Sequence, residues 1–188
     1  MKRIIMVIAL AAILATGTAF ADHPSGFGVG VVGQYGWGSG GGLGNVGLSL
    51  KIPAFPVYWA INFGADSNYF AIGLTGDYYM IDQALPVPTL HWFLGVGGFF
   101  NFFAYNETFY NSIKASYSHI NLGARVPIGL SWQPLPLLEI WIDIAPSLGL
   151  FIDSEGKYTY NNVNYTFHKG GAGLFWGIPL ELGLRLWF

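Results

Sequence analysis

The last seventeen residues, 172–188, alternate between apolar side chains and small or polar ones, and this period of two constrains the fold more than any other feature. Every even position is apolar, up to Phe188, whereas the odd positions include several glycines, Glu181 and Arg185. A period of two is that of a β-strand, whose successive side chains point to opposite faces. One wholly apolar face opposite a face with charges predicts a strand with lipid outside and a polar lumen inside.

The first 21 residues have the parts of a secretory signal peptide. Lys2 and Arg3 precede an apolar run at 4–14, and Ala19 and Ala21 form a small-x-small cleavage site. A membrane anchor is disfavoured because the apolar run is too short to cross a bilayer. We therefore expect a signal peptide at 1–21 and one outer-membrane β-barrel domain at 22–188.

The amino-acid composition also indicates a chain whose outer surface contacts lipid. Without the two basic residues of the leader, 6 of 8 basic residues remain against 10 acidic ones, a formal charge of about −4 that excludes binding to nucleic-acid phosphates. Apolar residues make up 53% and charged residues 10% of the chain, compared with about 25% charged residues in ordinary soluble domains. No apolar run of about 20 residues follows the leader, which leaves a closed barrel as the expected spanning structure. The chain has no cysteine, which excludes disulfides and thiolate chemistry.

The same period recurs in seven earlier segments. They cover residues 27–37, 45–52, 57–64, 69–79, 90–102, 119–132 and 138–150. With the terminal strand they predict an all-β, eight-stranded antiparallel up-and-down transmembrane β-barrel. A soluble lipocalin-like barrel would place apolar side chains inside and charges outside, which is the reverse of this pattern.

The connections between these strands form two alternating classes. Three compact ones contain proline and are expected to be periplasmic turns: 53–56, 81–88 and 133–137. The others, 39–42, 65–68, 104–117 and 152–167, are expected outside, and the last two are long and rich in Asn, Tyr and Ser. Both termini then lie in the periplasm.

Three prolines fall within predicted strands: Pro127, Pro146 and Pro179. Proline has no N–H to donate to the ladder, so each should require a local bulge or bend. The strand boundaries near them are therefore left open.

From residue 27 to Phe188 the chain resembles the small eight-stranded outer-membrane barrels, the class of the OmpA transmembrane domain, OmpX and OmpW. The glycine-rich pattern and proline-rich turns are closest to spirochaetal barrels. Phe188, Leu186 and Leu184 resemble the C-terminal signal that the outer-membrane assembly machinery reads. The resemblance implies export, insertion by that machinery and no cofactor, but it does not imply one activity.

Sorting the 16 mature charges by strand phase places seven of them in the lumen. They are Lys51, Asp77, Arg125, Glu139, Asp143, Glu181 and Arg185. None lies on the lipid face, where a charge near the midplane costs about 2–4 kcal/mol. We expect an ion-pair plug toward the periplasmic end, because desolvated charges must be paired, rather than a gate or proton-linked site. Beyond the plug, small or aromatic inward residues such as Gly36 and Phe99 predict a cavity open toward the loops.

Other motifs are weaker. Gly28, Gly30 and Gly33 match G-x-G-x-x-G, but no preceding strand or following helix supports a nucleotide site. Ser118 and His119 are adjacent and point to opposite faces, so they do not form a nucleophile–base pair. The four histidines show no metal-site spacing, and His91 is expected to be a satisfied lumen residue.

We therefore expect a non-enzymatic outer-membrane barrel with a plugged lumen, in contact with outer-membrane lipid. Its loops at 104–117 and 152–167 would have a structural, adhesin or host-factor-binding role toward an extracellular protein. The alternatives are a narrow conduit or binding cavity for small hydrophobic molecules and, third, a lipid-modifying enzyme. No catalytic residue, cofactor or metal site is expected.

Overall fold

The computed structural model describes residues 26–39, 43–109, 113–160 and 163–188, and within these ranges the regular structure is all β. The strands are β1 (Gly28–Gly38), β2 (Leu43–Lys51), β3 (Tyr58–Ala65), β4 (Tyr69–Ala84), β5 (Leu90–Phe109), β6 (Ile113–Arg125), β7 (Ile128–Leu135), β8 (Leu138–Ile144), β9 (Ser147–Asp153), β10 (Gly156–Tyr160), β11 (Val163–His168) and β12 (Gly171–Trp187). The expected signal peptide at 1–21 lies outside the described residues. No helix in these ranges is long and apolar enough to cross a membrane.

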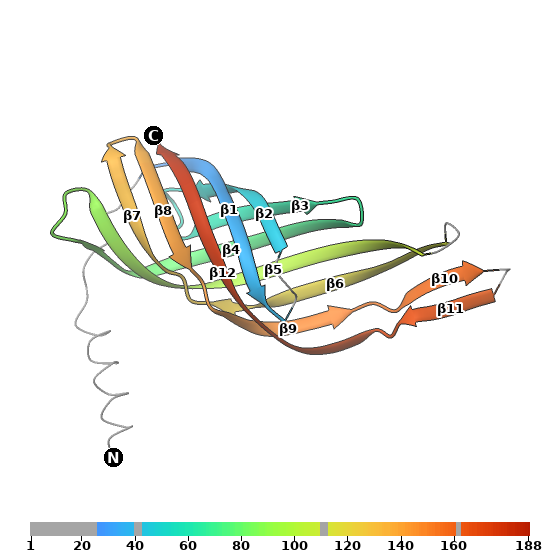
Figure 1. The fold of residues 1–188 in the computed structure, drawn as a ribbon. Coiled ribbons are helices and arrows are strands. Elements are labelled where there is room, and N and C mark those ends of the chain that lie inside the picture. The colour runs from blue at the N-terminus through green and yellow to red at the C-terminus, as the bar shows by residue number, and fades with distance from the viewer. Residues whose placement is uncertain (1–25, 40–42, 110–112, 161–162) are drawn as a thin grey trace, which may run out of the picture.

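The strands form one antiparallel sheet that closes on itself (Figure 1). Neighbours in sequence pair from β1 through β5, and β1 also pairs with β12, which joins the two ends of the series. Between β5 and β12 the sheet has two broken passes, β6 with β7 and β8 with β9. The ring therefore has the eight antiparallel up-and-down passes that the sequence predicts, and β10 and β11 lie beyond it.

Proline accounts for both broken passes. Pro127 separates β6 from β7, and Pro146 separates β8 from β9, because neither can donate a ladder hydrogen bond. The ladder continues through their carbonyls: the amide of Gly95 donates to Pro127 (2.8 Å) and that of Val126 to Pro146 (2.9 Å). β12 passes Pro179 without a break. No register shift occurs at these prolines: the irregularities at Pro127 and Pro146 are breaks rather than bulges, and β12 shows neither at Pro179.

β4 contains a bulge that the hydrophobic period of the sequence does not predict. Tyr79 pairs with Gly95 and Ile81 with Leu94, so Met80 is the extra residue. The extra residue reverses the phase of the strand, and Asp82 consequently joins the inward face. β4 continues to Ala84, so the turn expected at 81–88 begins several residues later than predicted.

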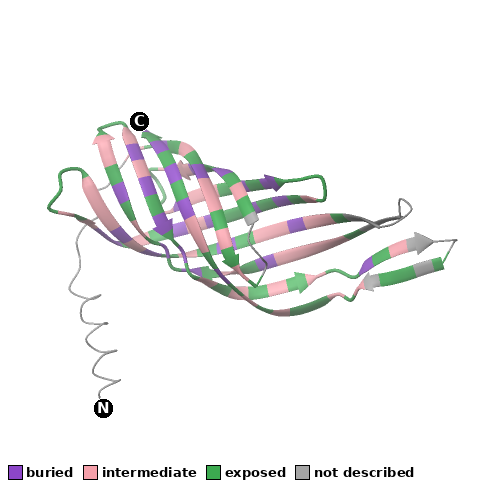
Figure 2. Cartoon of the chain, viewed as in Figure 1, coloured by how far each residue is buried: buried purple, intermediate pink, exposed green. Residues whose placement is uncertain are grey.

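Buried and exposed residues alternate along the strands of the ring, as expected when successive side chains point inward and outward (Figure 2). On β12, Leu182 is 57% exposed and its neighbour Glu181 is 6% exposed. The interior holds Val32, Phe93 and Trp141 together with buried polar and charged groups. The outside is therefore apolar and the inside mixed, which is the reverse of a soluble barrel.

Two hairpins extend the sheet past the ring, and together they are called the ribbon here: β5–β6 beyond residue 105, and β10–β11. Lys157 of β10 pairs with Ser116 of β6, which joins the two hairpins (Figure 1). The connections expected at 104–117 and 152–167 are thus mostly strand. The sequence pattern does not predict these strands, because Asn, Tyr and Ser make both of their faces polar.

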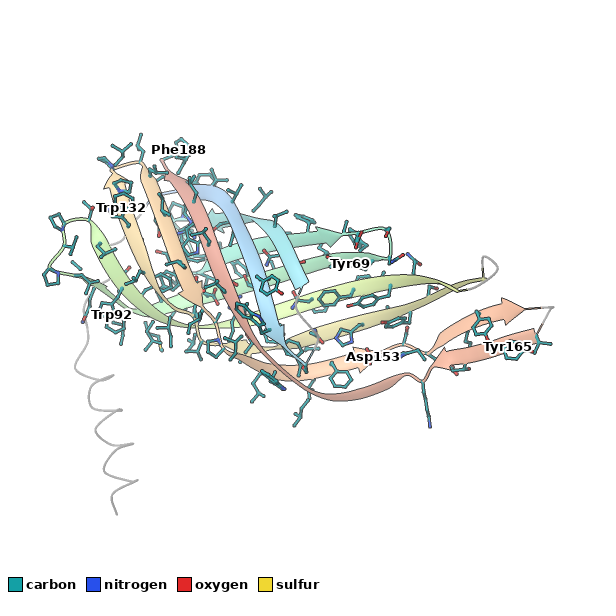
Figure 3. The ribbon with its side chains drawn as sticks, in the orientation of Figure 1. Tyr69, Trp92, Trp132, Asp153, Tyr165 and Phe188 are labelled. Carbon is teal, nitrogen blue, oxygen red and sulfur yellow. The ribbon has the colours of Figure 1, made fainter. Side chains whose placement is uncertain are left out.

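The two ends of the molecule differ (Figure 3). Trp92, Trp132 and Phe188 lie at one end, and Asp153 and Tyr165 lie toward the other, where the ribbon projects. The end with Phe188 is called the turn end here, because the β2–β3, β4–β5 and β7–β8 turns are there.

Deleting Met80 tests the bulge. Both flanking registers already match β5, so we expect the variant to fold with a loss of less than about 2 kcal/mol in unfolding free energy. Deleting Ile72, which pairs with Phe63 and Phe102, should instead move the rest of β4 to the wrong face and abolish folding. Urea unfolding and gel mobility of the two variants in micelles provide the measurement; equal damage would contradict the bulge assignment.

Candidate functional site in the lumen

The layer nearest the turn end is centred on Arg185 of β12. Its guanidinium lies 2.7 Å from a carboxylate oxygen of Glu139 and donates a 2.8 Å hydrogen bond to the Ser49 hydroxyl. Glu139 also accepts hydrogen bonds from the Ser131 hydroxyl (2.9 Å) and the Trp187 indole (2.9 Å). Arg185 and Glu139 are each 1% exposed. A buried pair with this many additional hydrogen bonds is one whose desolvation is compensated.

Aromatic rings complete this layer. The Arg185 guanidinium lies 4.3 Å from the Trp141 ring centroid, 4.8 Å from that of Tyr58 and 5.4 Å from that of Trp187. Tyr79 stacks between Tyr58 (4.2 Å) and Phe93 (4.3 Å). An eight-stranded ring has an interior just wide enough to be filled by side chains, and these rings and the ion pair occupy it at this level.

A second layer is centred on Arg125 of β6. Its Nη1 lies 2.8 Å from Glu181 and its Nε 3.2 Å from Asp77. The Gln34 side chain donates a 2.7 Å hydrogen bond to the same Glu181 oxygen. Arg125 is 2% exposed, so this ion-pair triad is also inside the ring.

The remaining two predicted lumen charges are placed differently. Asp143 is buried directly opposite Glu181 on β8, and its Oδ1 has no hydrogen-bond partner among the described residues. Lys51 ends β2, where its ammonium donates to the Phe55 carbonyl (2.6 Å) and lies 5.3 Å from the Tyr58 ring centroid. It therefore belongs to the β2–β3 turn rather than to either ion-pair layer.

Asp82 is a lumen acid that the sequence pattern does not predict. It is 2% exposed, and its carboxylate lies 3.3 Å from Nδ1 of His91. It lies in the segment predicted as a turn, and the even positions of this strand are predicted to face outward. The bulge at Met80 reverses the phase and brings Asp82 inside. The paired His–Asp spacing of nine residues was the available signal.

Toward the ribbon, two histidines share one carboxylate. The Nδ1 of His119 is hydrogen-bonded to Asp153, and Nε2 of His168 lies 3.6 Å from its other oxygen. In the described part of the chain, no group of three or more His, Cys, Asp or Glu residues has metal-site geometry.

Between Arg125 and the ribbon lies a cavity of about 90 Å³, called the upper cavity here. Phe99 and Phe175 form part of its wall, and Gln34, Asn121 and Arg125 supply polar groups. The cavity that the glycine and aromatic positions predict is therefore present, and amide and charged side chains line it beside the glycines and aromatic rings.

Comparisons place this architecture among known folds. The model of a family described as "Protein of unknown function (DUF3996)" matches residues 35–175. No curated protein matches the sequence. Among solved structures, a major outer membrane protein from Thermus thermophilus is 14% identical with a TM-score of 0.54, covering 86% of this chain and 99% of that one. This likeness supports the small outer-membrane barrel fold.

Two other solved structures are similar over most of their length. Neisserial surface protein A (NspA) is 15% identical, with a TM-score of 0.45 and coverage of 86% of this chain and 96% of that one. The N-terminal β-barrel domain of Pseudomonas aeruginosa OprF is 14% identical, with a TM-score of 0.44 and coverage of 84% and 96%.

The Arg185 layer predicts an asymmetric mutational response. Glu139→Ala leaves a buried guanidinium without its carboxylate and should lower the unfolding free energy by about 3–5 kcal/mol. Glu139→Leu combined with Arg185→Met should recover part of this loss, because no charge is then left unpaired. Urea unfolding in micelles measures both variants.

The exposed pair Glu155–Lys157 provides the control. Its atoms are 2.8 Å apart, but the side chains are 47% and 58% exposed, so solvent screens the pair and Glu155→Ala should cost much less stability than Glu139→Ala. A loss in Glu139→Ala no larger than in Glu155→Ala would show that the lumen pair is not a stabilising layer.

Proposed function

The chain belongs to the DUF3996 family, and we propose that it is an integral, non-enzymatic protein of the bacterial outer membrane. Its barrel would cross the bilayer, with the lumen sealed at the turn end and the ribbon on the cell surface. The ribbon would then be the part that contacts other molecules, as a structural, adhesin or host-factor-binding element.

The observation that carries this proposal is the charge-free apolar exterior of the ring. Leu148, Leu174 and Leu182 are 64%, 73% and 57% exposed on neighbouring passes. Among the described residues of the ring, charged side chains lie inside or at strand ends. Soluble proteins rarely expose contiguous apolar patches larger than a few hundred Å². A belt of this kind that surrounds the molecule is accounted for when lipid covers it.

Aromatic residues at the two ends support the same placement. Trp132 and Phe188 are 46% and 73% exposed at the turn end (Figure 3). Trp37 and Phe70 are 51% and 47% exposed near the opposite strand ends. Aromatic girdles at both interfaces are typical of transmembrane barrels.

Orientation follows from the unequal ends. Outer-membrane barrels have short periplasmic turns and longer extracellular segments, so the turn end with Phe188 is assigned to the periplasm and the ribbon to the exterior. Phe188, Leu186 and Leu184 would then be available as the assembly signal during insertion.

The ribbon has the composition of a recognition surface. Val163 and Tyr165 are 50% and 43% exposed on β11, close to the Glu155–Lys157 ion pair. Exposed tyrosine among mixed polar groups is common in protein-binding surfaces. A conduit for small hydrophobic molecules has less support, because the two arginine layers fill the lumen. No feature of the described residues favours a lipid-modifying enzyme.

The sealed lumen predicts a lack of ion conduction. In planar bilayers the purified protein should show no stable open level, because the Arg185 layer and its rings leave no continuous water path. A known porin inserted in the same bilayers serves as the positive control. Large, stable, voltage-independent conductance would contradict the seal.

Removing the ribbon tip tests its role. Replacing residues 157–166 with an Asn-Gly turn leaves every ring pairing intact, so the variant should fold and reach the cell surface normally. If the ribbon recognises protein, binding of intact cells to immobilised extracellular-matrix and serum proteins should fall to the level of cells without the protein. Unchanged binding by the shortened protein would remove the adhesin and host-factor roles.

A further inference from the structure

The upper cavity combines features that specify a ligand, and we infer that it binds a vicinal-diol group of a neutral polyol or sugar. Its floor is the Arg125 triad, and its walls bring together aromatic rings and side-chain amides. This binding goes beyond the proposed display role, because it uses the inside of the barrel rather than the ribbon.

The size of the cavity limits what can enter it. A cavity of about 150 Å³ holds a benzene molecule, which has six non-hydrogen atoms. The upper cavity has about 90 Å³, enough for about four such atoms. A terminal diol, two carbons with two oxygens, has this size, and the remainder of a longer molecule would extend toward the ribbon.

Charge balance excludes an ionic group. Arg125 already faces the carboxylates of Asp77 and Glu181, and Asp143 lies opposite Glu181. An anion would approach three carboxylates, whereas a cation would lie against the guanidinium that lines the cavity. The carboxylates outnumber the guanidinium and disfavour an anion, but Arg125 lines the cavity and they do not, so a cation would meet the guanidinium first. A neutral group is repelled by neither charge.

Residues that line the cavity also have unpaired hydrogen-bonding atoms, both donors and acceptors. Among the described residues, Nη2 of Arg125 has no acceptor, and Oδ1 of Asn121 and of Asn45 have no donor. Arg125 and Asn121 are only 2% and 3% exposed. Buried polar groups are normally paired. A hydroxyl, which both donates and accepts, satisfies such a set better than a group that does only one.

Aromatic rings in the cavity wall would pack against the carbon atoms of the ligand. Phe99 and Phe175 pack with centroids 5.4 Å apart, and Phe103 also lines the cavity. The C–H bonds of a polyol chain or sugar ring pack against such rings while its hydroxyls turn toward the amides. A purely apolar ligand would leave the unpaired atoms of Arg125 and Asn121 unsatisfied.

Gly36 permits a test that leaves the fold intact. It lines the cavity, and a Cβ built on it would meet nothing within 4 Å. Gly36→Val should therefore fill the site without a clash. Gly171→Val is the matched control, since Gly171 also has open space around it but does not line the cavity.

The probes are glycerol and D-glucose, with 1-butanol, acetate and methylammonium as apolar and charged comparisons. Binding is measured by saturation-transfer NMR on the protein in a detergent without a sugar head group. We expect glycerol and D-glucose to bind the native protein and the Gly171→Val variant. Binding should be lost in Gly36→Val and weakened about fivefold in Asn121→Leu, which removes one hydrogen-bonding group.

Equal binding in Gly36→Val and Gly171→Val, stronger binding of 1-butanol or of either ion, or no binding of the two diols would overturn the inference. Phosphatidylglycerol ends in the same diol, so its competition with D-glucose distinguishes a lipid head group from a free sugar as the source, and either source keeps the diol assignment. None of these outcomes depends on what the ribbon binds.

Discussion

The hydrogen-bonded ladder between β1 and β12 is the constraint on which the rest of the structure depends. Its eleven residue pairs, from Gly28↔Trp187 to Gly38↔Gly177, join the first strand of the chain to the last. Closure removes the free edges of the ring, so its backbone groups are paired without water. It also creates an inside and an outside, and because strand side chains alternate, each residue of the ring must suit one or the other.

Most other features follow from that division. The outer positions are apolar, so the ring needs lipid rather than water around it. A ring of eight strands has an interior just wide enough for side chains, so charges that face inward and are buried lose their hydration and need partners. Arg185 does so with Glu139 and three aromatic rings, and Arg125 does so with Asp77 and Glu181. The ion-pair layers and the small upper cavity are thus consequences of one ring size.

Sequence reasoning recovers what the period of two encodes and fails where that period is interrupted. It predicts the eight passes and the inward placement of Glu181 and Arg185, because neighbouring apolar residues fix the phase. It misses Asp82, since a one-residue bulge at Met80 reverses the phase without any change in residue type. It places Lys51 in the lumen network, because the phase of a strand shows which face a residue is on but not how close the residue is to the end of the strand. The Lys51 ammonium instead donates to the Phe55 carbonyl in the β2–β3 turn. The strands of the ribbon are not predicted, because strands with polar residues on both faces have no hydrophobic period.

The central claim is that the outer face of the ring lies in lipid, and the absence of cysteine allows a direct measurement of it. Single cysteines at Leu74, Ile142 and Leu182 on outer positions, at Thr75 on an inner position and at Leu137 in a turn would carry nitroxide labels in lipid vesicles. If the outer face lies in lipid, labels at the three outer positions will collide often with oxygen, which dissolves in lipid, and rarely with a water-soluble nickel chelate. The opposite is expected at Leu137. This placement also predicts slow relaxation by either reagent inside the ring, at Thr75. Access of the nickel chelate to the outer positions equal to that at Leu137 would contradict the placement of this ring in a membrane.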